Sequence, residues 1–160
     1  MSPRSGIPQH QRPNTSFSSL CIYGLGAGVA GVAAMTLSQK IEQYFTSRPN
    51  SLVPGYTMQH LFGLAPRPEK AMFPLNMAMH YGQGAAAGIV RAIMSINGVQ
   101  GPFATFIFVG IRLAIDQTLE NWTGVGSLPW TWPVGEQIID IFHKSVYALA
   151  TGFLTDRFLS

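Results

Sequence analysis

The spacing of charged residues along the chain predicts where its helices lie. From Pro13 to Gln39 no Asp, Glu, Lys, Arg or His occurs. Because about 20 helical residues cross the hydrocarbon core of a bilayer, residues 18–37 are long enough to span one. We therefore predict a first helix over about 18–45, whose charged end extends beyond the membrane.

Two further apolar segments follow a proline-containing connector. Between residues 71 and 111 the only Asp, Glu, Lys, Arg or His residues are His80 and Arg91. A proline stands at the start of each segment, where its missing N–H costs nothing, and an Asn-Gly pair between them favours a turn. The pattern predicts two helices here, over about 74–96 and 102–119.

A fourth helix is predicted from a polar stripe on an otherwise apolar segment, over about 134–158. The stripe recurs at spacings of three and four, so its members share one helix face: Glu136, Asp140, His143, Tyr147 and Thr151. A narrow polar face is typical of a span that packs inside a bundle. It equally fits a helix that lies in the lipid headgroups.

The connectors carry their own signals. The segment 47–54 contains two prolines, which end the first helix, and residues 56–64 are interpreted as a short amphipathic or re-entrant piece. All three tryptophans fall at or within the connector before the fourth helix, where an interfacial aromatic belt is expected: Trp122, Trp130 and Trp132.

The composition favours a membrane environment. Charged residues make up 11% of the chain, whereas soluble domains carry about 25%. The predicted fold is thus an all-α, integral membrane, four-transmembrane-helix bundle over residues 17–160, after a disordered polar tail over 1–16. The membrane and the orientation stay open, because nearly equal numbers of Lys and Arg fall on the two sides.

Small residues recur at helical spacing in the first two long helices. The run Gly26-x-Gly28-x-x-Gly31 matches a dinucleotide-binding fingerprint, but that motif needs a preceding strand and a parallel sheet. In apolar helices, small residues four apart instead let backbones approach closely. Three such pairs predict close helix packing: Gly24 with Gly28, Ala27 with Gly31, and Gly84 with Gly88.

Ionisable residues inside the predicted spans are costly, at roughly 2.5–3.5 kcal/mol each near the bilayer centre. Arg112 is followed one turn later by Asp116, and Lys144 is preceded one turn earlier by Asp140. In antiparallel neighbours Arg112 can reach Asp140, and Lys144 can reach Asp116, giving a neutral clamp. A buried proton or ligand site is the alternative. Arg91 lies near a helix end and is expected to extend to the membrane surface.

Polar residues of the second helix could complete such a site. Asn76 and His80 share a face with Gly84 and Gly88. If that face meets the fourth helix, His80 and His143 converge with Asp140 or Glu136, the usual parts of a general acid–base pair. The candidate catalytic residues are His80, Asp116, Asp140 and His143, and the candidate binding residues are Arg112, Lys144, Asn76 and Glu136.

Other interpretations of the same residues stay open. Plain hydrogen bonding between helices would account for them, and histidine with carboxylate could also bind zinc or iron. No metal-ligand spacing such as H-E-x-x-H is present, so we expect neither a metal nor a cofactor. Sequons at Asn14 and Asn121 would lie on opposite faces of a four-span protein, so at most one is expected to be glycosylated.

One stretch resembles a known group of proteins. The Gly/Ala-rich run from Gly24, ending in Glu42 and then Ser47-Arg48-Pro49-x-Ser51-x-Val53-Pro54, looks like small polytopic membrane proteins of bacteria and fungi. The segment Asn76…His80-Tyr81-Gly82-x-Gly84…Gly88 is similar to their second span. The resemblance covers residues 24–96 and implies a four-helix membrane fold. It implies no activity, because that group is uncharacterised.

Three function classes remain. The favoured one is a structural or accessory membrane subunit, which would bind a protein partner or a second copy through its Gly/Ala faces. The second is a membrane-embedded cyclase, isomerase or oxygenase that acts on a lipid, terpenoid or polyketide through the His/Asp residues. The third is an oligomer that conducts protons or solutes. The bilayer is the expected partner in each class, and nucleic acid in none.

Overall fold

The computed structural model describes residues 16–159, and all regular structure in that range is helical. The α-helices are α1 (Phe17–Thr46), α2 (Val53–Leu61), α3 (Phe73–Ile96), α4 (Gly101–Trp122) and α5 (Val134–Leu159). Short 3₁₀ helices, η1 (Glu69–Ala71) and η2 (Pro129–Thr131), lie in the connectors. The four predicted helices are confirmed to within a few residues. The predicted tail and the sequon at Asn14 lie outside the described residues.

The helix ends follow local signals in the sequence. Ser16 caps α1 through its hydroxyl, which accepts a hydrogen bond from Ser19 N at 3.2 Å. The C-cap residue of α1 is Ser47, whose φ is 57°. Proline stands in the first turn of α2, α3 and α4. Pro54 therefore begins a helix, and the piece predicted over 56–64 is a helix that starts at Val53.

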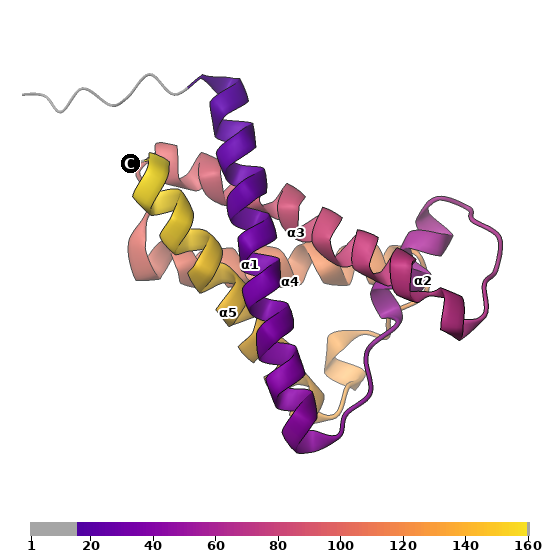
Figure 1. Cartoon of the computed structure of the whole chain (residues 1–160). Coiled ribbons are helices and arrows are strands. Elements are labelled where there is room, and N and C mark those ends of the chain that lie inside the picture. The colour runs from indigo at the N-terminus through magenta and orange to yellow at the C-terminus, as the bar shows by residue number, and fades with distance from the viewer. Residues whose placement is uncertain (1–15, 160) are drawn as a thin grey trace, which may run out of the picture.

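The long helices form an arrangement that opens toward one end (Figure 1). α1 packs against α3 and α5, and α4 packs mainly against α5. The first residues of α1 and the last of α5 lie at the end where α3 turns into α4. At the opposite end the helices diverge, and the connectors 47–52 and 123–133 lie between them. Helix α2 and the loop after it lie beside the start of α3. The connectors 47–52 and 123–133 thus lie at the open end of the bundle.

The glycines of α1 and α3 let the two helix backbones touch. A Cβ atom added to Gly24 would lie 2.8 Å from the Cα of Ile89, and one added to Gly28 would lie 2.8 Å from the Cα of Ala85. Gly88 faces the α1 backbone at Gly24 and Gly28 in the same way, whereas Gly84 faces the side chain of Val32. The predicted close packing of these helices is confirmed. The six-residue glycine motif lies within α1, and no strand occurs in the described range.

Several charged side chains lie in the interior, whereas large apolar side chains face outward. Arg91 is 0% exposed and Arg112 is 2% exposed, whereas Phe103 and Phe106 of α4 are 72% and 76% exposed. The expectation for Arg91 was wrong. Instead of extending to the surface, its guanidinium lies 2.6 Å from the carboxylate of Asp156, because the end of α5 passes beside this part of α3.

Two of the helices, α1 and α4, are long and apolar enough to cross a membrane. Core helices of soluble proteins can have the same length and composition, so these properties alone do not make either helix a span. The described part of α3 and α5 does not meet the same criterion. Asn121 lies in the last turn of α4 and is half-buried.

Candidate functional site

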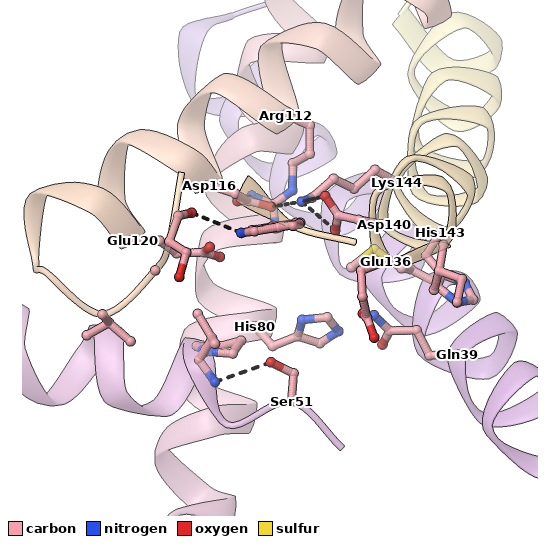
Figure 2. Close-up of a pocket in the computed structure, with 18 of the residues that line it drawn as sticks. Gln39, Ser51, His80, Arg112, Asp116, Glu120, Glu136, Asp140, His143 and Lys144 are labelled. Carbon is pink, nitrogen blue, oxygen red and sulfur yellow. Dashed lines mark hydrogen bonds and ion pairs between the residues drawn. The ribbon is translucent and has the colours of Figure 1, made fainter. Parts of the chain in front are cut away.

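A cavity of about 400 Å³ lies at the open end of the bundle. Helices α1, α3, α4 and α5 form its walls, and the connectors after α1 and α4 cover it (Figure 2). Its floor is made of buried residues: Met35, Arg112, Asp116, His143 and Lys144. Its mouth is made of exposed residues: Ser51, Ser127, Pro133 and Glu136. Polar groups from six separate segments therefore converge on one space.

A network of four charged side chains forms much of the floor. Arg112 donates to Asp116 one turn along α4. Lys144 of α5 lies 3.2 Å from the second oxygen of Asp116 and 2.7 Å from Asp140. The predicted contact between Lys144 and Asp116 is confirmed, so α4 and α5 are joined by an ion pair. The predicted contact between Arg112 and Asp140 is not formed, because Arg112 turns to its own helix.

Tyr147 of α5 contacts both the charged network and the backbone of α3. The guanidinium carbon of Arg112 lies 5.3 Å from the centre of the Tyr147 ring, a geometry in which the aromatic face attracts the cation. The hydroxyl of Tyr147 donates to the carbonyl of Gly84 at 2.6 Å. The backbone of α3 is thereby connected to the charged floor, and the Arg112 side chain is held in place.

The two candidate histidines both line the cavity but are held by α1. The Nε2 atom of His80 lies 3.2 Å from the hydroxyl of Thr36, and the Nδ1 atom of His143 lies 2.8 Å from the hydroxyl of Ser38. In Figure 2 the ring of His80 points into the cavity from α3. His80 and His143 thus line the same cavity as Asp140 and Glu136.

The charged end of α1 lies beside the cavity. Glu42 follows the apolar part of α1 and accepts a hydrogen bond from Arg48 at 2.8 Å. Hydrogen bonding from Arg48 lowers the pKa of the Glu42 carboxyl to about 2, so this group is ionised at neutral pH. Its Oε2 atom lies 3.6 Å from Nε2 of His143. Arg48 itself lines the cavity, and Glu42 balances its charge.

Asn76 has a different role from the one predicted. Its amide donates to the carbonyl of Ser51 at 3.1 Å, and its side-chain oxygen accepts from Gly55 N at 2.8 Å. Asn76 is not among the residues that line the cavity. It ties the connector after α1 and the start of α2 onto α3, and so positions the connector that covers the cavity.

Three lining residues were not predicted from the sequence: Arg48, Glu120 and Trp132. Glu120 lies one helical turn after Asp116, which itself lies one turn after Arg112. This regular spacing of polar residues along α4 could have revealed Glu120 as a lining residue. Arg48 and Trp132 belong to connectors, which only the folded chain brings to the cavity. Trp122 and Trp130 are highly exposed, whereas Trp132 is half-buried and its indole N–H donates to the carbonyl of Ser127 at 3.0 Å.

The arrangement can supply general acids and bases, cations and hydrogen-bond donors to a bound molecule. Over residues 16–159 no three His, Cys, Asp or Glu side chains come together as a metal site would require. The zinc or iron alternative therefore has no geometric support within that range. No protein family, curated protein or solved structure matches this chain.

Proposed function

We propose that the chain is an integral membrane protein in which α1, α3, α4 and α5 each cross the bilayer. Its distribution of polarity supports this proposal, since large apolar side chains of all four helices face outward while Arg91, Arg112 and Lys144 are buried. In water this would leave a large apolar surface uncovered. In lipid the same surface is solvated, and the buried charges pair with one another.

Reporter fusions test this topology. Four crossings place the segment 97–100 on the same side as both termini, and the connectors 47–72 and 123–133 on the opposite side. We expect a reporter after Asn97 to agree with one after Ser160, and a reporter after Ser127 to differ from both. Reporters at residues 1 and 160 on opposite sides of the membrane would contradict the four-span arrangement.

Within this bundle, we propose that the cavity is the binding site of a small molecule. The observation that carries the proposal is a space of about 400 Å³ in which seven charged side chains and two histidines meet. Charges are expensive in a membrane protein and are usually retained for function. The volume falls within the range of roughly 300–1,000 Å³ that is typical of ligand sites.

A membrane-embedded enzyme is the second candidate. It is favoured by the presence of His80, Glu136 and Asp140 around one cavity, because histidine and carboxylate can transfer protons to and from a bound substrate. Such an enzyme would be of the cyclase, isomerase or oxygenase type and would act on a lipophilic substrate. A bound molecule that is chemically changed on incubation with the protein would distinguish this candidate from simple binding.

The accessory role favoured from the sequence stays a prediction, as does the conducting oligomer. The glycines expected to bind a partner are occupied within this chain, since Gly28 and Gly88 contact each other across α1 and α3. A partner subunit or a second copy would therefore have to bind another surface.

Filling the cavity tests the binding proposal. Ile139 lines the cavity, whereas its neighbour Ile138 is 62% exposed on the outer face of α5. We expect native mass spectrometry of the full chain in mild detergent to show a bound small molecule. Ile139→Trp should lose it, because the indole occupies part of the cavity, and Ile138→Trp should keep it. A wild-type spectrum with no bound molecule, or equal occupancy in the two variants, would contradict the proposal.

A further inference from the structure

The cations that line the cavity are already neutralised. Among residues 16–159, each one has a carboxylate of its own within ion-pair distance, and these pairs are Arg48 with Glu42, Arg112 with Asp116, and Lys144 with Asp140. A cation whose charge is satisfied by a close carboxylate has less remaining attraction for an anionic ligand. We therefore assign these three cations to stabilising the fold through ion pairs, and not to binding an anionic ligand.

Two lining carboxylates have no such partner. Neither Glu120 nor Glu136 forms an ion pair or a side-chain hydrogen bond within the described part of the chain. Glu136 lies in the first turn of α5, where the helix dipole favours a negative charge. Glu120 lies in the last turn of α4, where the dipole opposes one. Helix stability thus gives no reason for a carboxylate at Glu120.

Apolar groups lie in the same cavity as these carboxylates. Trp132 and Ile139 line it together with Glu120 and Glu136. The indole N–H of Trp132 is bound to the carbonyl of Ser127, which fixes the ring. Aromatic faces attract organic cations as well as apolar groups. The cavity therefore offers two carboxylates without ion-pair partners, one from α4 and one from α5, and an apolar wall.

We propose that the ligand of this cavity is an organic amine, held in its cationic form by Glu120 and Glu136, with an apolar body against Trp132 and Ile139. This inference rests on the proposed function of the cavity as a ligand site. An anionic ligand would meet two unpaired carboxylates, and it would have to displace Glu42, Asp116 or Asp140 to reach a cation. An amine needs no such rearrangement.

Three probes of similar shape and different charge test the inference by calorimetric titration of the full chain in mild detergent. They are 2-phenylethylammonium, the neutral 2-phenylethanol and the anionic 3-phenylpropanoate. We expect the ammonium to bind at least about tenfold more tightly than either of the others, since a hydrogen bond to a charged group contributes this much or more. Glu120→Gln and Glu136→Gln should each reduce ammonium binding by about the same factor.

Glu69→Gln is the matched control, because Glu69 is exposed in η1 and does not line the cavity. This variant should bind the ammonium as the wild type does. Glu136 is itself exposed at the mouth, so its variant should keep the fold even if Glu120→Gln does not. Tighter binding of 3-phenylpropanoate, equal binding of all three probes, no binding of the ammonium, or no effect of Glu136→Gln would overturn the amine assignment. The Ile139→Trp experiment decides separately whether the cavity is a ligand site at all.

Discussion

Gly28→Ala is expected to lower the free energy of unfolding by about 2–3 kcal/mol, the upper part of the range for overpacked interiors. The added methyl group would lie 2.8 Å from the Cα of Ala85 and would also contact the carbonyl of Gly84. These atoms belong to the backbone of α3, so they cannot move aside as a flexible side chain can. The two helices would have to separate.

Gly26→Ala on the same helix is the matched control. No atom lies within 4 Å of a Cβ at Gly26, so this variant should be neutral or more stable by up to about 1 kcal/mol, since alanine favours helix over glycine. Equilibrium unfolding of both variants in detergent, followed by tryptophan fluorescence, gives the two free energies. Equal stability of Gly28→Ala and Gly26→Ala would show that α1 and α3 do not touch through this face.

The second large effect is expected at Asp116. Asp116→Asn should cost about 3–5 kcal/mol, because it removes the carboxylate of a buried pair and leaves Arg112 without a counter-ion. Arg112 is 2% exposed, so water cannot take the place of the lost carboxylate. Asp140→Asn should cost less. The side chain of Asp140 is 28% exposed, and Lys144 would keep Asp116 at 3.2 Å.

The double variant Arg112→Leu with Asp116→Leu separates structure from function. It removes one cation and one carboxylate and leaves Lys144 paired with Asp140, so it should be more stable than Asp116→Asn. Unfolding free energies of the two proteins provide the comparison of stability. Native mass spectrometry then shows whether the double variant retains the small molecule that we propose the cavity binds. If Asp116→Asn is as stable as the wild type, water reaches this carboxylate and the charged floor is not buried.

The extents of the long helices were predictable because their signals are local. A run without charges, a proline in the first turn and an Asn-Gly turn each act within a few residues of the chain. The same is true of the glycine pairs, since Gly24 with Gly28 and Gly84 with Gly88 mark faces that permit close approach. Helix α2 was less clear, because Pro54 could either end one helix or begin another.

The choice of partners for charged groups could not be predicted in the same way. Arg112 has Asp116 one turn away and Asp140 on the next helix, and the rotation of α4 against α5 decides between them. Arg91 lies near enough to a helix end to reach water, yet the end of α5 brings Asp156 to it. Spacing along one helix says which residues share a face, but it does not say what that face meets.

By itself the sequence determined the helices, their close-packing faces and the set of polar residues that an apolar environment would have to bury. The tertiary structure decided that most of those polar residues meet in one cavity, that Asn76 serves the connector instead, and that Glu120, Arg48 and Trp132 join the cavity. The reason is physical. Helix formation depends on neighbours within a turn or two, whereas the cavity depends on how the glycine contacts of α1 and α3 set the crossing of helices far apart in the chain.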